Sequence, residues 1–189
     1  MDKEALDLDG AMKYFNLSVY GDLLAREDKE TIAMDAILLG KSRALEIRKE
    51  AGPCSARQLI QALGIAVREE HGRRGWDRDF VKFGEYLART KEIRLNMEAI
   101  GVVGRTMGTE LVREIVLSHE LYHHFECTRW GFTSERFVRE LKIFSCIPVK
   151  RKILPAAEIA AGEFTREFLS LDYRPGIIEE CYFEEAGHL

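Results

Sequence analysis

IVLSHELYHHFE, residues 115–126, contains three of the chain's five histidines within six positions. His119, Glu120 and His123 form the pattern H-E-x-x-H. Residues four positions apart on an α-helix lie about 5–6 Å from each other on one face, so both imidazoles can reach one metal ion at about 2.0–2.1 Å. Glu120 lies beside that face, where it can contact a metal-bound water instead of the metal. The stretch therefore predicts a helix that carries two ligands and a general base.

The same residues have a plainer interpretation, as the polar face of an ordinary helix. H-E-x-x-H is expected by chance in about one or two chains per hundred of this composition. Two features favour a metal site: the preceding sequence is apolar, with Val112 and Val116 on the histidine face, and a candidate third ligand follows downstream. His124 points away from the pair, so we interpret it as a hydrogen-bonded structural residue.

A catalytic zinc site requires three protein ligands and a water. No third histidine follows at the short spacing of the pattern H-E-x-x-H-x-x-G-x-x-H, in which Glu126 occupies the glycine position. His71 precedes the motif in a predicted loop, and His188 is next to the C-terminus. Both histidines are weaker candidates than a carboxylate on a later helix.

The predicted helix PAAEIAAGEFTREFL, residues 155–169, offers Glu158, Glu163 and Glu167. Glu158 and Glu163 are five residues apart, which is about 140° around a helix axis, so only one of them can point at the ion. The small residues 160–162 would let this helix approach the histidine helix, and the first helical turn favours a carboxylate. Glu158 is therefore the predicted third ligand. In the alternative interpretation, its carboxylate only stabilises the start of the helix.

The bulk composition suits one domain of 189 residues with a real core, since 46% of the residues are hydrophobic and 32% are charged. The net charge of −4 and pI of about 5.8 do not favour direct nucleic-acid binding. No apolar run approaches the ~18 residues of a membrane helix, and the acidic N-terminus lacks a signal-peptide pattern. The four cysteines are widely scattered, which is typical of reduced thiols. We therefore expect a cytoplasmic protein without a membrane span.

The hydrophobic periodicity predicts helices and a small sheet. Residues 28–50 are expected to form an amphipathic helix whose apolar face includes Leu45, and Ser55 is expected to cap the next helix. Further expected elements are a strand start at 65–67, a hairpin over 81–100 with Ile93, Leu95 and Met97 alternating, a glycine-containing loop at 101–109, a helix at 109–126 beginning at a Thr109 cap, a strand at 141–149 and a helix from Pro155. This order predicts the α+β class.

IVLSHELYHHFE followed by EIAAGEFTREFL resembles the ImmA/IrrE-type metallopeptidases. Their pattern is H-E-hydrophobic-x-H and then, some thirty residues on, E-x-x-A-N-x-F-A-x-x-L-L. In this chain Glu158, Ala161, Phe164 and Leu169 match the second part. The segments ARQLIQALGIAV and EIRLNMEA are also similar to the family, and the resemblance covers roughly residues 35–175.

The resemblance implies a zincin-like, gluzincin-type small domain with an H-E-x-x-H helix, a short antiparallel or mixed sheet and a downstream glutamate-bearing helix. It also implies that His119, His123 and Glu158 bind Zn²⁺ and that Glu120 is the general base of a zinc metallopeptidase. The expected substrate is a protein, in this family often a helix-turn-helix transcriptional repressor. The alternative function is a non-proteolytic metal-binding sensor or protein-interaction module that retains the fold.

Three segments follow from the extent of the resemblance: an N-terminal extension at 1–34, a metallopeptidase-like domain at 35–175 and an acidic C-terminal tail at 176–189. We expect the tail to be solvated, with an autoinhibitory strand over the cleft as the alternative.

Two residues depart from the family pattern. Gly162 replaces an asparagine, which removes a potential hydrogen bond near the metal. Tyr122 stands where glycine is common, which predicts a narrower cleft. The residue that steadies the oxyanion is left open among Tyr86, Tyr122, Tyr173 and Arg105.

Overall fold

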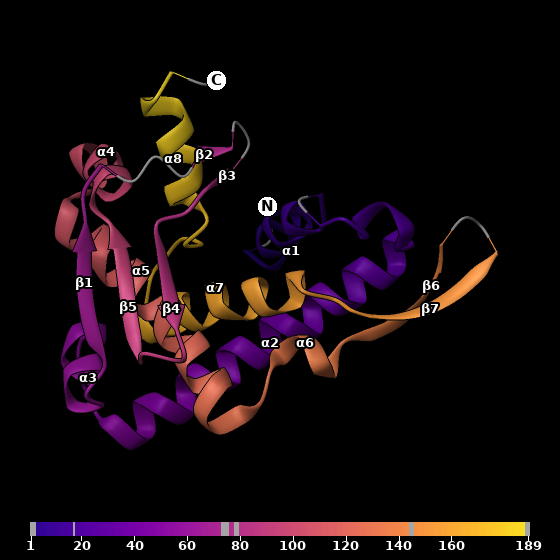
Figure 1. Ribbon diagram of the computed structural model, residues 1–189, viewed down its shortest axis with the longest axis horizontal. Helices are drawn as coiled ribbons and strands as arrows, with labels where there is room; N and C mark the ends of the chain where they lie inside the picture. The colour runs from indigo at the N-terminus through magenta and orange to yellow at the C-terminus, as the bar shows by residue number, and fades with distance from the viewer. Residues whose placement is uncertain (1–2, 17, 73–75, 78–79, 144–145, 188–189) are drawn as a thin grey trace.

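The computed structural model describes residues 3–16, 18–72, 76–77, 80–143 and 146–187. Helices and short strands lie largely in separate runs along the chain, which confirms the predicted α+β class (Figure 1). The described strands form a three-stranded sheet and two separate two-stranded ribbons. No helix in this described part combines the length and the apolar character that crossing a bilayer would require.

The three-stranded sheet includes an edge strand that borders the candidate site. Its order is β1 (Ala66–Glu70), β5 (Glu92–Asn96) and β4 (Gly84–Leu87). β5 runs parallel to β1 and antiparallel to β4, so the predicted hairpin is confirmed as β4–β5. Ile93 and Leu95 are fully buried, as their alternation predicted, but Met97, predicted to continue this strand, is the first residue of the following helix. A short ribbon pairs β2 (Trp76–Asp77) with β3 (Phe80–Val81).

The segment after β5 is a helix, α4 (Met97–Met107), and the predicted glycine-containing loop at this place is wrong. Asn96 ends the strand and caps the helix, since its side-chain oxygen accepts the backbone N–H of Ala99 at 3.2 Å. Ile100 and Val103 are fully buried on one face of α4. This burial offsets the helix-weakening effect of Gly101 and Gly104.

The histidine-bearing helix, α5 (Thr109–Phe125), is confirmed and continues into a π-helical turn, η2 (Glu126–Trp130). Thr109 does not cap it; Gly108 precedes the helix with a φ of 90°, a conformation that favours glycine. The helix packs against α4, β4 and β5 on one side and against α7 on another. It therefore connects the sheet to the helical half of the molecule.

The helical half is built on α2 (Arg26–Ala51) and α7 (Pro155–Leu169), which pack closely against each other. The buried face of α2 is mostly small and consists of Ile32, Ala33, Ala36, Gly40, Ala44 and Ile47. Leu45, predicted on that face, is half-exposed. A methyl group at Gly40 would lie 2.2 Å from the carbonyl oxygen of Ala160, so glycine is required for the close approach of the two helices.

Smaller elements complete the frame. α3 (Ala56–Ala62) begins at the predicted Ser55 cap, which forms a full capping box with Gln58. After α6 (Thr133–Arg136) the chain forms a projecting hairpin of β6 (Val138–Ile143) and β7 (Ile147–Lys152) (Figure 1). The single strand predicted at 141–149 is therefore two strands, and Pro148 lies within β7, opposite Lys142, instead of ending a strand.

Both ends of the described chain are packed helices. α1 (Lys3–Asn16) leads through a 3-10 turn, η1 (Gly21–Leu23), into α2, which crosses the predicted boundary at residue 34. The predicted solvated tail is instead α8 (Ile177–Glu185), which packs against α4. Its Ile178 and Tyr182 are buried, and burial of these apolar side chains favours a packed helix over both a solvated tail and an autoinhibitory strand.

Candidate metal centre

The three predicted ligands come together between α5 and α7. Nε2 of His119 lies 3.2 Å from Nε2 of His123 and 3.2 Å from Oε2 of Glu158. Nε2 of His123 lies 3.7 Å from the other carboxylate oxygen of Glu158. Among the described residues, this is the group of three metal-ligating side chains whose ligand atoms all lie within 4.8 Å of one another.

These separations fit a zinc ion. Tetrahedral coordination at about 2.0–2.1 Å places neighbouring ligand atoms about 3.3 Å apart. The side chains of His119 and His123 are 23% and 21% exposed and that of Glu158 is 47% exposed, so the group faces an open cleft. The group could therefore hold a divalent cation and leave a coordination position open beside the three protein ligands, which closed structural sites do not.

Glu126 orients the second histidine from behind. Its Oε2 lies 2.7 Å from Nδ1 of His123, and its Oε1 accepts the backbone N–H of Thr133 at 2.6 Å. When Nδ1–H of His123 donates to this buried carboxylate, Nε2 keeps a free lone pair directed at the metal position. The sequence pattern places Glu126 only at the glycine position of the longer motif, and the predictions from it did not include an orienting role for this residue. The i, i+3 spacing from His123 was the available signal.

Two groups of the site, His123 and Glu158, have shifted pKa values, and both shifts favour the charged form of the side chain. Burial lowers the pKa of His123, but the hydrogen bond that its Nδ1–H donates to Glu126 and the charges of Glu158 and Glu120 outweigh it and raise that pKa to about 9. Burial raises the pKa of Glu158, but the hydrogen bond and charge of His119 outweigh it and hold that pKa at about 2. A carboxylate that stays ionised beside imidazoles is a suitable ligand for a divalent cation.

Glu120 lies between the ligands and the edge strand β4. It is buried, and the backbone N–H of Tyr86 donates to its carboxylate. Burial raises its pKa, which makes it a stronger base than a surface glutamate. Gly84 permits this approach, because a methyl group there would lie 2.6 Å from Val116 Cγ1 and 3.3 Å from Glu120 Cγ.

The ligands and Glu120 line a cleft of about 650 Å³. One wall is β4 with the segment before it, and the floor is α5 with Val116 on the histidine face as predicted. The opposite wall comes from both ends of the chain: Tyr14 of α1, the segment 18–20 and Glu179 of α8. Neither Tyr14 nor Glu179 was identified from the sequence, because no spacing within α1 or α8 relates them to α5.

The other candidate ligands lie outside the group. Glu163 points away from Glu158, as its position around the helix predicted, and pairs with Arg166 at 2.7 Å. Glu167 and the exposed His71 are not among the clustered ligands, and His188 lies outside the described residues. His124 bonds the hydroxyl of Tyr86 through Nδ1 at 2.9 Å, which confirms its structural role.

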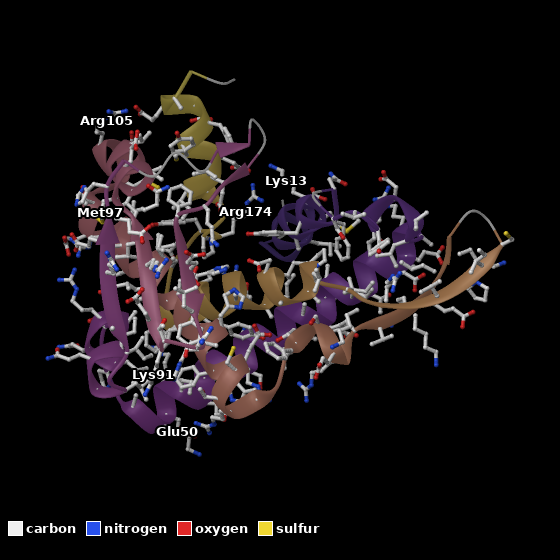
Figure 2. All side chains as sticks on the ribbon, viewed as in Figure 1. Lys13, Glu50, Lys91, Met97, Arg105 and Arg174 are labelled. Carbon is white, nitrogen blue, oxygen red and sulfur yellow. The ribbon has the colours of Figure 1, made fainter. Side chains whose placement is uncertain are left out.

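Three of the four oxyanion candidates do not reach the cleft. Tyr122 is buried and its hydroxyl lies 2.6 Å from Thr133 Oγ1, so the prediction that it narrows the cleft is wrong. Arg105 projects from the far end of α4 beside Glu185 (Figure 2), and Tyr173 does not line the cleft. Tyr86 does line the cleft, but its hydroxyl is already hydrogen-bonded to His124.

Gly162, which stands at the family's asparagine position, also lines the cleft. A side chain at this position would meet open space.

Comparisons of the chain with protein-family models, with curated proteins and with solved structures gave no match. The arrangement of His119, His123, Glu158 and Glu120 is therefore interpreted from its own chemistry.

Proposed function

We propose that this protein is a zinc-dependent metallopeptidase that hydrolyses a peptide bond of a protein substrate. The observation that carries the proposal is the convergence of His119, His123 and Glu158 at tetrahedral spacing, with Glu120 beside them and a cleft in front. The proposal includes a zincin-like, gluzincin-type fold and membership of the ImmA/IrrE-type family, which rest on the resemblance of the two motifs.

Each residue has a distinct role in the proposed reaction. His119, His123 and Glu158 would hold the ion, and Glu126 would orient His123. A bound zinc ion supplies a water of pKa near 7 and polarises the substrate carbonyl. Glu120 accepts the proton of that water as it attacks, and then delivers the proton to the nitrogen of the leaving amine.

The hydroxyl of Tyr14 is the donor that we assign to the developing negative charge on the carbonyl oxygen. Tyr14 lines the cleft, and its pKa is raised by burial and by the charges of Glu179 and Glu158. A phenol with a raised pKa keeps its proton at neutral pH and can donate it in a hydrogen bond.

The edge of β4 is the surface that we assign to the substrate backbone. β4 is the last strand of the described three-stranded sheet, and Gly84, Glu85 and Tyr86 line the cleft next to Glu120. An extended peptide that pairs with such an edge gains main-chain hydrogen bonds and lies across the ion. A repressor-like regulatory protein with an exposed linker would be a suitable substrate. The four free thiols fit the cytoplasmic location that we propose.

The test is Glu120→Gln, with Glu110→Gln as the matched control, because Glu110 lies on the same helix with a side chain that is 71% exposed. Glu120→Gln should keep about one zinc per chain by elemental analysis and lose about 100-fold or more of peptide cleavage. The control should retain both properties. The zinc-loaded Glu120→Gln protein should also retain substrate in a pull-down from lysate.

Two results would contradict the proposal. Cleavage by Glu120→Gln at the wild-type rate would show that Glu120 is not the general base. Stoichiometric zinc without cleavage of any protein by the wild type would instead favour the metal-binding sensor or interaction module.

A further inference from the structure

Glu179 is a carboxylate in the wall of the cleft that the proposed reaction does not use. It comes from α8, yet it lines the same cleft as His119, Glu120 and Glu158. Its Oε2 is buried, and no described side chain or backbone group hydrogen-bonds that atom. Burial without a partner is costly for a carboxylate oxygen.

The cations around the cleft are engaged elsewhere. Glu180, the next residue along α8, pairs with Lys13 at 2.6 Å and with Arg174, and both of these basic residues are labelled in Figure 2. Lys82 and Lys152, the two lysines in the described lining of the cleft, pair with Glu85 and Glu135 at 2.5 Å and 2.6 Å. Glu85, Glu135 and Glu180 thus have basic partners, whereas Glu179, which lines the cleft beside Glu120 and Glu158, has no described basic residue paired with it.

Glu179 and Tyr14 meet at Gly176. A methyl group at Gly176 would lie 3.7 Å from the hydroxyl oxygen of Tyr14 and 3.8 Å from Oε2 of Glu179. The corner therefore presents a carboxylate and a phenol oxygen, and both can accept hydrogen bonds from one N–H donor group. Burial raises the pKa of Glu179 to about 7, with His119 lowering it and Glu158 raising it, so Glu179 shares one electrostatic environment with the metal ligands.

We propose that Glu179 forms a subsite for a positively charged group of the substrate, an ammonium or a guanidinium, next to the scissile peptide bond. The inference rests on the proposed peptidase function and adds a substrate class to it. A cationic group of the substrate supplies the hydrogen bonds and the positive charge that Oε2 lacks. A substrate with such a group is therefore bound more tightly than a neutral one. Two kinds of substrate carry such a group: a chain with a lysine or arginine side chain beside the cleaved bond, and a chain whose free N-terminus lies there.

The first experiment profiles cleavage of a peptide library made by digesting cell protein at glutamate residues. Wild-type protein should cleave beside lysine or arginine, or next to a free N-terminus, about ten-fold more often than library frequency. Glu179→Gln should lose this preference, and Glu184→Gln, an exposed position on the same helix, should keep it. Acetylating only the N-termini of the library removes the preference if the free N-terminus supplies the charge and leaves it if a lysine or arginine side chain does, without a mutation in the protein.

The second experiment reads binding without cleavage. Immobilised, zinc-loaded Glu120→Gln protein should enrich cationic peptides from the same library, and Glu120→Gln/Glu179→Gln should not. Enrichment by the first protein alone supports the subsite even where the wild type cleaves nothing, a result that overturns only the peptidase function. Cleavage with no charge preference, or with a preference that survives Glu179→Gln, overturns the subsite and leaves the peptidase function standing.

Discussion

Oε2 of Glu126 lies 2.7 Å from Nδ1 of His123, and the same carboxylate accepts the backbone N–H of Thr133 through its other oxygen. The backbone that follows η2 thereby fixes the carboxylate, and the carboxylate fixes the imidazole. A histidine whose ring and tautomer are set in advance loses less freedom when it binds a metal. The proposed zinc site therefore depends on a residue that touches no metal.

Removing this carboxylate should weaken metal binding. We expect Glu126→Gln to lower zinc affinity by about 10–100-fold, because Nδ1 of His123 loses a charged partner. Competition with a fluorescent zinc chelator measures the change. Glu110→Gln, on the exposed face of the same helix, serves as the control, and equal affinities for Glu126→Gln and wild type would contradict the orienting role.

Glu158 and Glu163 provide a contrast on one helix. Glu158→Gln should lower zinc affinity by about 100-fold or more, because it removes a ligand oxygen that lies 3.2 Å from His119 Nε2. Glu163→Gln removes a partner of Arg166 and should lower stability while leaving zinc content unchanged. Elemental analysis after gel filtration distinguishes them, and loss of zinc from Glu163→Gln instead would reverse the ligand assignment.

Gly40 should be intolerant of any side chain. Gly40→Ala places a methyl 2.2 Å from a carbonyl oxygen of α7, and we expect it to lower the free energy of unfolding by about 2 kcal/mol or more. Gly101→Ala is the matched control, since a methyl in the open space beside this α4 glycine should raise the free energy of unfolding by up to about 1 kcal/mol. Urea unfolding of the metal-free proteins measures both changes, and similar effects at the two positions would argue against the close α2–α7 contact.

The buried carboxylate of Glu179 should make stability fall as pH rises. Its folded pKa of about 7 lies above its usual value of 4.5, so its favourable contribution is complete below 4.5 and is lost as pH rises through 7. Tyr14, His119, Glu158 and Glu180 are the neighbouring titratable groups. Between pH 5 and pH 8.5, metal-free Glu179→Gln should gain about 2 kcal/mol relative to wild type.

Urea unfolding at several pH values measures this gain. Glu184→Gln, which is exposed, should follow the wild type across the range. A constant difference between Glu179→Gln and wild type from pH 5 to pH 8.5 would show that the Glu179 carboxylate is not desolvated.

Local regularities were sufficient to predict much of this molecule. Helical periodicity identified the helix that carries His119 and His123, and it separated Glu158 from Glu163. The Ser55 cap, the β4–β5 hairpin and the start of α7 at Pro155 also follow from nearest-neighbour chemistry. In each case the signal lies within a few residues, because backbone hydrogen bonds and side-chain spacing along one element generate it.

Tertiary structure alone decided the rest. α4 forms across two glycines because burial of Ile100 and Val103 outweighs local propensity, and α8 forms because its apolar residues find a surface to cover. Tyr14 and Glu179 meet in the cleft although they lie near opposite ends of the chain. Packing between distant segments sets the separation of Glu158 from the histidines and the isolation of Glu179, and no spacing within a single element encodes such distances.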